Sequence, residues 1–205
     1  MPFKCPGAPQ KIAYLAADHL RRKNILQGSK VRFFTATPAI FGVPLFARAL
    51  TKVAARYGIE VGVSQNLVAV DGAARKATFE FVDGDRKGER FTVAYDMLHV
   101  TPPQRAPDFI EASLLANADG WVDVDQHSLR HAKYDNVFSL GDACSSPNSK
   151  TAAAIRKQSP MVVRNILRTR QGRALEGGYD GYASCPLTTA YGKVIMAEFV
   201  FGGKV

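Results

Sequence analysis

The hydrophobic period of the sequence changes near residue 60, and this change most constrains the fold. Before it, apolar residues recur at helical spacing over 8–26 and 45–57, around a short buried-strand pattern at 31–34. After it, apolar and polar residues alternate with a period of two. The four alternating segments are 60–63, 66–71, 76–82 and 90–95. Helices and strands in alternation, followed by a β-meander, are typical of a doubly wound nucleotide-binding domain with an antiparallel insertion.

Local signals indicate the ends and faces of the two helices. Pro9 suits the first turn of helix 8–26, and Gly58 is a natural stop after helix 45–57. The apolar stripes that we expect to face the core are Ile12, Leu15, Ala16 and Leu20 in the first helix and Leu45, Ala49, Leu50 and Val53 in the second.

A double proline, Pro102-Pro103, marks the expected domain boundary, because proline ends regular structure. Residues 97–100, just before it, predict one more buried strand. We therefore expect two domains, residues 1–101 and residues 102–205.

The second domain carries a strand–turn–helix pattern. Residues 136–140 predict a buried strand that ends in Gly141-Asp142. Residues 151–170 predict a basic helix that Pro160 kinks or breaks.

Charge and cysteine usage exclude several classes of protein. No apolar run approaches the roughly 20 residues that span a bilayer, and no secretory signal is visible. Three cysteines are too few for a disulfide scaffold. The net charge of +9 is concentrated in residues 1–60, where ten basic side chains face two acidic ones. This excess favours anionic partners, but no nucleic-acid-binding motif accompanies it, so we expect no specific nucleic acid.

The Gly141-Asp142 pair is the first candidate for chemistry. In an open α/β sheet, ligands lie at the carboxyl ends of strands, where Asp142 could accept hydrogen bonds from sugar or ribityl hydroxyls. Ser149-Lys150-Thr151 then supplies a helix cap, and Thr151 is suited to that position. Free N–H groups at such a helix start would stabilise an anionic ring edge.

The cysteines are the second candidate. Cys5 lies beside Lys4 and just before a helix start, and both features lower the pKa of a thiol. Cys185 lies in a turn between aromatic residues, and Cys144 follows Gly141-Asp142 closely. Each could equally be an inert, buried side chain. The scattered histidines have no companions at metal-ligand spacing, so no metal site is expected.

Eight segments together resemble the sulfide:quinone oxidoreductases, in the branch that includes the mitochondrial enzymes. They are Phe3–Lys11, Ala39–Val43, Tyr95–Pro103, Gly120–Asp125, Tyr134–Phe138, Gly141-Asp142, Ser149–Ala154 and Tyr179–Leu187. The resemblance covers essentially the whole chain. It implies an α/β fold of the two-Rossmann flavoprotein type, with residues 1–101 as the second, NAD-type Rossmann-like domain and 102–205 as part of the FAD-binding domain.

The resemblance also implies an activity and its residues. Cys5 and Cys185 match a redox pair on which sulfide attacks a disulfide or trisulfide, leaving a persulfide on Cys185. Electrons then pass from Cys5 through FAD to quinone, and a small acceptor such as sulfite or glutathione removes the sulfane sulfur. Gly141, Asp142, Lys150 and Thr151 match the residues that face the flavin. Cys144 is expected to be structural.

The family further implies peripheral attachment to the cytoplasmic side of a bacterial inner membrane or to the mitochondrial inner membrane, with this portion itself soluble. The basic surface would then contact acidic lipids or attract hydrosulfide. The oligomeric state stays unknown.

The sequence departs from the family in two respects: it has no Gly-x-Gly-x-x-Gly to hold the FAD pyrophosphate, and the apolar helices that form the family's quinone site past Phe201 are not matched. We therefore expect a C-terminal portion of such an enzyme, active poorly or not at all by itself. Two alternatives remain: a flavoprotein that reduces quinone from NADH, and a non-catalytic nucleotide-binding or nucleic-acid-binding module.

Overall fold

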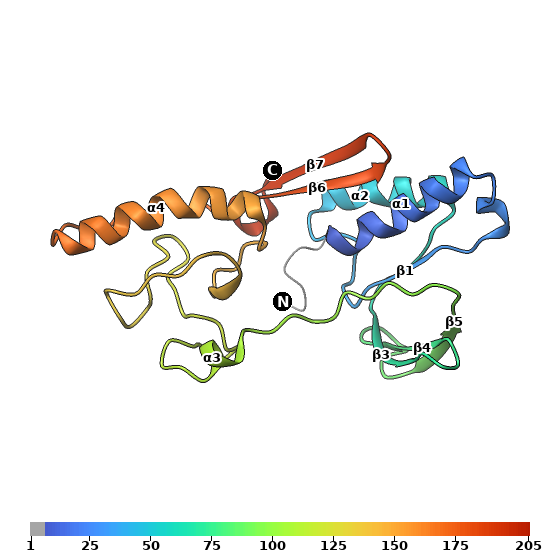
Figure 1. Ribbon diagram of the computed structural model, residues 1–205, viewed down its shortest axis with the longest axis horizontal. Coiled ribbons are helices and arrows are strands. Elements are labelled where there is room, and N and C mark those ends of the chain that lie inside the picture. Colours follow the sequence, from blue (N-terminus) through green and yellow to red (C-terminus); the bar gives the residue numbers. More distant parts are fainter. Residues whose placement is uncertain (1–6) are drawn as a thin grey trace. The chain divides into compact units, whose positions relative to one another are not determined.

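Helices and strands alternate up to residue 62, three further strands follow up to residue 94, and the chain is mostly irregular from there to residue 151 (Figure 1). The structure is a computed structural model, and it describes residues 7–205. Its helices are α1 (Ala8–Arg22), α2 (Pro44–Tyr57), α3 (Asp108–Glu111) and α4 (Ala152–Arg170). Its strands are β1 (Arg32–Phe34), β2 (Glu60–Gly62), β3 (Gln65–Asp71), β4 (Lys76–Phe81), β5 (Arg90–Ala94), β6 (Ala183–Ala190) and β7 (Lys193–Phe199).

The described residues divide into two compact units. The sheet unit contains residues 7–101 and 187–195, and the loop unit contains residues 102–186 and 196–205. The assignment of residues 1–101 and 102–205 to two domains of a flavoprotein stays a prediction.

In the sheet unit, β1 and β2 form a parallel pair connected by α2, which is the expected βαβ arrangement. Gly58 ends α2 in the left-handed conformation, with φ of 67°, which glycine adopts without strain. The buried face of α2 includes Leu50 and Val53, as predicted, whereas Leu45 is exposed.

The antiparallel meander of β3, β4 and β5 also forms as the period-two segments predict. Its buried face is aromatic: the Phe79 ring lies 4.4 Å from that of Phe34 and 5.6 Å from that of Phe91, measured between centroids. These rings attach β1 to the meander through side-chain packing.

The predicted face of α1 is wrong. Ile12 and Leu15 are exposed, and the buried residues are Gln10, Tyr14, Ala17 and Asp18. Gln10 is buried because its amide donates to the Ile40 carbonyl and accepts from the Tyr14 hydroxyl. Hydrogen bonding therefore overrides the hydrophobic pattern here, and the helix also ends at Arg22 rather than at residue 26.

The loop unit has little regular structure besides α4. One core holds it together, made of Ile110, Val122, Val124, Leu129, Cys144, Met161, Val162 and Tyr179. Pro160 lies inside α4, which continues through it without a break.

Two predicted strands are absent from the described residues. Residues 97–100 form no ladder, and Met97 is 73% exposed. Residues 136–140 make a single bridge, Arg130 to Phe138, although Phe138 and Leu140 do pack against the core. The apolar side chains of Phe138 and Leu140 are therefore buried by packing, with one isolated bridge in place of a strand.

Candidate functional site

The turn at Gly141 favours glycine. Gly141 has φ of 65°, and a Cβ there would lie 3.1 Å from the Ile155 side chain in the first turn of α4. A short 3-10 turn, Gly141–Ala143, begins at this residue. A side chain at this position would therefore add backbone strain and require Ile155 to shift.

A buried glutamine holds this turn in place. The Gln158 side chain, which is completely buried in α4, accepts from the Gly141 N–H at 2.9 Å. Its amide also donates to Asn148 Oδ1 at 3.3 Å, and Asn148 donates to the Ser149 carbonyl at 2.9 Å. One side chain thus fixes both ends of the loop from Gly141 to Ser149.

The N-terminus of α4 is capped as the sequence predicts. Thr151 is extended, and its hydroxyl accepts from the Ala154 N–H at 3.2 Å. The N–H groups of Ala152 and Ala153 have no acceptor within the helix, so they give this end a positive potential. A helix start of this kind favours an anionic or electron-rich ligand.

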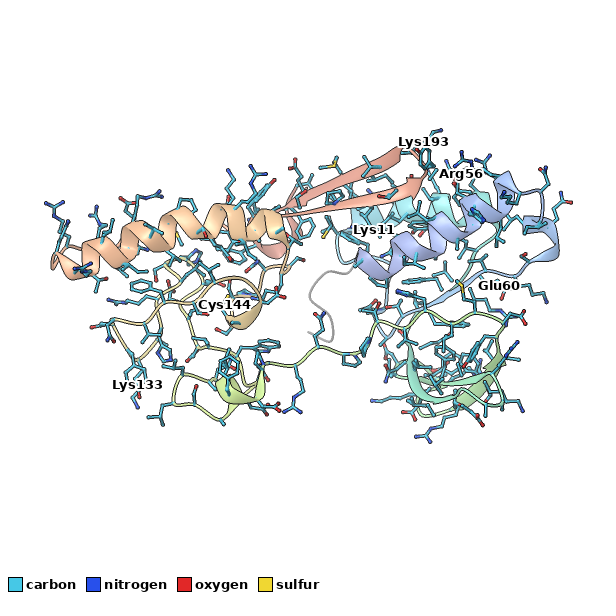
Figure 2. All side chains as sticks on the ribbon, viewed as in Figure 1. Lys11, Arg56, Glu60, Lys133, Cys144 and Lys193 are labelled. Atoms are coloured by element: carbon cyan, nitrogen blue, oxygen red, sulfur yellow. The ribbon has the colours of Figure 1, made fainter. Side chains whose placement is uncertain are left out.

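A cation and an unpaired hydroxyl lie in the same loop. The Lys150 ammonium donates to the Ser146 carbonyl, and its Nζ lies 3.5 Å from the Sγ of Cys144, which Figure 2 labels. Cys144 is fully buried, and its thiol donates to the Gly141 carbonyl at 3.3 Å. The Ser146 hydroxyl is buried and has no partner among the described residues. A buried polar atom of this kind is available to a ligand.

Cys185 lies in the same unit, on β6, and is 1% exposed. The segment that leads to it is held by Tyr179, whose hydroxyl donates to the Tyr182 carbonyl at 2.8 Å. Burial raises the pKa of Tyr179, so this hydroxyl stays protonated and keeps donating.

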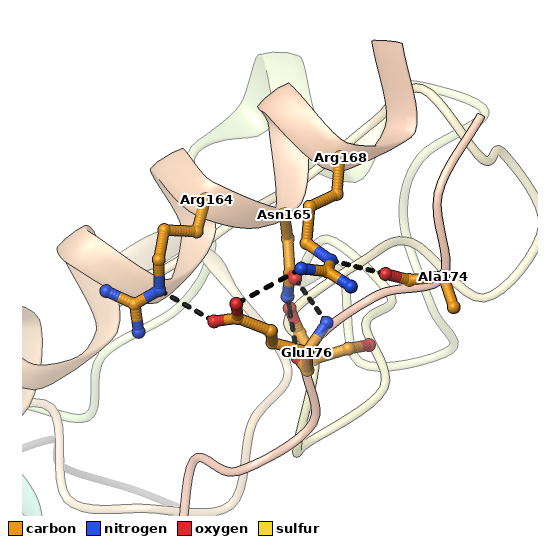
Figure 3. A network of polar contacts seen from close by, with 6 residues as sticks. Arg164, Asn165, Arg168, Ala174 and Glu176 are labelled. Carbon is orange, nitrogen blue, oxygen red and sulfur yellow. Dashed lines mark hydrogen bonds and ion pairs between the residues drawn. The ribbon is translucent and has the colours of Figure 1, made fainter. Parts of the chain in front are cut away.

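The segment between α4 and β6 is also tied to α4 (Figure 3). Asn165, fully buried, accepts from the Glu176 N–H at 2.8 Å and donates to the Glu176 carbonyl at 3.0 Å. The Glu176 carboxylate pairs with Arg164 at 2.7 Å and with Arg168 at 3.3 Å. The approach to Cys185 is therefore fixed at Glu176 as well as at Tyr179.

The predicted site residues fall into three groups. Gly141, Lys150 and Thr151 are brought together at the start of α4, with Asp142 exposed beside Gly141. Cys185 shares the loop unit with them. Cys5 lies outside the described residues.

Sequence reasoning missed Gln158, Asn148 and Ser146. A signal for Gln158 was present, because it falls on the buried stripe of α4 with Ala154, Met161, Val162 and Asn165. A polar residue at an apolar position of a helix indicates a buried hydrogen bond.

Within residues 7–205, no cluster of three or more possible metal ligands occurs. No helix in this described range has the length and hydropathy needed to cross a bilayer.

Two solved structures share the fold of this chain. The structure superposes with a TM-score of 0.79 on sulfide:quinone oxidoreductase from Aquifex aeolicus, at 18% identity, covering 92% of this chain and 46% of that one. A chain in the mitochondrial ATP synthase structure of Tetrahymena thermophila gives 0.76 at 26% identity, covering 93% and 46%. The expected α/β class with a Rossmann-like domain is confirmed.

Sequence comparison finds mitochondrial sulfide:quinone oxidoreductases among the similar proteins. The chain is 44% identical over 203 residues to the mitochondrial sulfide:quinone oxidoreductase of Dictyostelium discoideum and 43% identical over 198 residues to that of Mus musculus. These matches cover 97–98% of this chain but 44% of each relative, so the chain spans less than half the length of these relatives. No family model matches. The chain is similar to these sulfide:quinone oxidoreductases over that share of their length, and the predicted resemblance is confirmed.

Proposed function

We propose that this chain forms part of an FAD-dependent enzyme that oxidises sulfide and reduces quinone. The observation that carries the proposal is the identity of 44% and 43% to sulfide:quinone oxidoreductases over nearly the whole chain. The loop unit adds a physical basis, since it combines a glycine turn, a capped helix start and a buried cysteine.

The residues around Gly141 fit FAD by the chemistry of their donors. The N–H groups of Ala152 and Ala153 and the Lys150 ammonium suit an electron-rich ring edge. Asp142, exposed beside the glycine turn, suits ribityl hydroxyls, and the unpaired Ser146 hydroxyl offers one more hydrogen bond. FAD, when bound here, would supply two-electron redox chemistry between the cysteines and quinone.

Cys185 and Cys5 are proposed as the redox pair. Attack by hydrosulfide on the Cys185 sulfur forms a new S–S bond and breaks the bond to Cys5. Cys185 then carries a persulfide, and Cys5 leaves as a thiolate that holds the electron pair for transfer. A small sulfane-sulfur acceptor, such as sulfite or glutathione, would remove the outer sulfur of the persulfide.

The remaining expectations concern location. The relatives are named mitochondrial, which supports a place on the mitochondrial inner membrane. We propose a peripheral attachment through basic side chains that contact acidic lipids.

A pair of glycine variants tests the proposed FAD site. Gly141 and Gly172 both adopt positive φ, of 65° and 66°, but only Gly141 has a neighbour, Ile155, within reach of a Cβ. Gly141→Ala and Gly172→Ala therefore introduce similar backbone strain, and only the first also crowds the start of α4.

FAD is titrated into the 205-residue chain and followed by the flavin spectrum. We expect Gly141→Ala to weaken FAD binding at least about tenfold and Gly172→Ala to leave it within about twofold, since only a displaced helix start affects the ligand. Equal FAD affinity in the two variants would mean that the flavin does not bind at the Gly141 turn. A wild-type chain that binds no FAD would remove the cofactor from this chain altogether.

A further inference from the structure

The sheet unit contains a basic pocket remote in sequence from the proposed FAD site. It has a volume of about 350 Å³, which lies in the range of small-ligand sites. Its lining residues are Asp18, Arg21, Arg22, Arg56, Tyr57, Ala190, Tyr191 and Lys193. They come from the C-terminal ends of α1 and α2 and from the turn of the β6–β7 hairpin, and Figure 2 labels Arg56 and Lys193.

One buried carboxylate joins these three elements. Asp18, which is 3% exposed, accepts from Arg21 at 2.8 Å, from the Tyr57 hydroxyl at 3.2 Å and from the Tyr191 N–H at 3.1 Å. The Tyr57 hydroxyl oxygen also lies 3.0 Å from the Thr189 carbonyl oxygen, so its one hydrogen is shared between this carbonyl and Asp18. The wall of the pocket is therefore a fixed hydrogen-bonded structure.

Two further guanidinium groups are held against aromatic rings. Arg22 Cζ lies 5.0 Å from the centroid of the Tyr191 ring, and Arg56 Cζ lies 4.9 Å from that of Tyr57. Stacking of this kind positions a guanidinium and leaves its N–H donors available.

The charges around the pocket do not balance. Asp18 neutralises Arg21, whereas Arg22, Arg56 and Lys193 have no acidic side chain within ion-pair distance among residues 7–205. Three cations that line one pocket repel each other, and an anion among them would relieve this repulsion.

We propose that this pocket binds the phosphate group of an anionic ligand. Arginine donates in a planar fork that matches phosphate oxygens, and Lys193 supplies a compact charge beside it. A phosphate could come from a soluble phosphate ester or from a lipid headgroup. The proposal does not depend on the redox function, because none of the lining residues belongs to the loop unit.

Two arms of one experiment separate the sources. In the first arm, inorganic pyrophosphate is titrated into the 205-residue chain by calorimetry. In the second, the chain is floated with phosphatidylcholine vesicles that contain or lack phosphatidic acid. Pyrophosphate binding indicates a soluble ligand, and flotation only with phosphatidic acid indicates a lipid headgroup.

A matched pair of double variants makes the test specific. Arg22→Gln/Arg56→Gln removes two charges from the pocket, and Arg48→Gln/Lys52→Gln removes two from exposed positions of α2. In whichever arm the wild-type chain binds, we expect the first double variant to bind at least about tenfold more weakly, since charge-assisted hydrogen bonds are lost. We expect the second to change binding less than about twofold, because exposed charges outside the site are screened.

Either of two results would overturn the proposal. One is no binding in either arm by a wild-type chain whose circular dichroism shows it to be folded. The other is equal loss in both double variants, which would mean that diffuse positive charge is responsible. Circular dichroism of the three proteins checks that each variant is folded.

Discussion

The sheet unit and the loop unit are held together in different ways. In the sheet unit, most backbone groups of α1, α2 and β1–β5 are hydrogen-bonded within helices or in ladders between strands. Apolar and aromatic side chains fill its core. In the loop unit, the long connection between residues 112 and 151 has only isolated bridges and one 3-10 turn. Side chains such as Gln158 and Asn165 take over the role of the ladder there. The proposed flavin residues Gly141, Asp142 and Lys150 lie in this long connection, and Thr151 caps α4 at its end, whereas the proposed redox residue Cys185 lies on β6.

This difference teaches how such a site is positioned. A ladder fixes a strand along its whole length, but it also uses up the backbone donors. A loop held at a few points by side chains leaves backbone N–H groups, such as those of Ala152 and Ala153, available to a ligand.

The largest effect should come from the aromatic core of the sheet unit. Phe79→Ala removes the ring that contacts Phe34 and Phe91 and should cost about 3–5 kcal/mol of unfolding free energy. Denaturant unfolding measures this cost, with Val70→Ala as an exposed control on β3, expected below about 1 kcal/mol. Hydrogen exchange should rise in β3–β5 first; a rise of equal size in α4 would contradict a division into two units.

A smaller but more local effect is expected in the loop unit. Gln158→Leu keeps the side-chain volume but leaves the Gly141 N–H and Asn148 Oδ1 without their partner. We expect this change to lower the free energy of unfolding by about 2–3 kcal/mol. The same change at the exposed Gln171 should be nearly neutral. Protection of the Gly141 amide from hydrogen exchange is the readout. If it is unchanged in Gln158→Leu, the loop is fixed by other contacts.

The sheet unit should also show a pH dependence that comes from one buried carboxylate, Asp18. The hydrogen bond from Arg21 is the main cause that lowers the pKa of Asp18 to about 2, followed by that from the Tyr191 N–H. Its stabilisation is present above the unfolded pKa and is lost as the pH falls through the folded value. Since solvent screens the Arg21 guanidinium, we expect the free energy of unfolding to fall by about 1–2 kcal/mol between about pH 5 and pH 2.

The free energy of unfolding of the wild type and of Asp18→Asn, measured across this pH range, isolates the contribution of the Asp18 carboxylate. Asp18→Asn should be less stable at the upper end and should show a flatter slope with pH. Parallel slopes would mean that Asp18 does not titrate differently in the folded and unfolded chain.

The smallest effect is expected at the Glu176 carboxylate. Its pairs with Arg164 and Arg168 are partly exposed, so Glu176→Gln should cost less than about 1 kcal/mol. Asn165 binds Glu176 through the backbone and is unaffected by this change. If thermal unfolding shows that Glu176→Gln lowers the free energy of unfolding by more than about 2 kcal/mol, the ion pairs rather than Asn165 hold this segment in place.

The same contrast explains what the sequence could predict. The β-meander and α2 were predictable because their side chains alternate with the period of the structure. The buried face of α1 was not, because Gln10 and Asp18 are buried through partners on distant segments. Residues 136–140 have the composition of a strand, but they pack without forming one.

At the candidate site, the cap at Thr151 and the turn at Gly141 followed from local chemistry. The unpaired Ser146 hydroxyl could not be predicted, because a partnerless buried atom is a property of the whole surrounding structure. The resemblance, rather than any spacing, led to the proposed pairing of Cys5 with Cys185.

The most direct test of the proposed function is the flavin spectrum of the FAD-loaded chain before and after anaerobic addition of sulfide. We expect the flavin absorbance to bleach in the wild-type chain and in Cys144→Ser, and to persist in Cys185→Ser and in Cys5→Ser. Bleaching that survives in Cys185→Ser would contradict the account, because the electrons would then reach the flavin without the proposed redox pair.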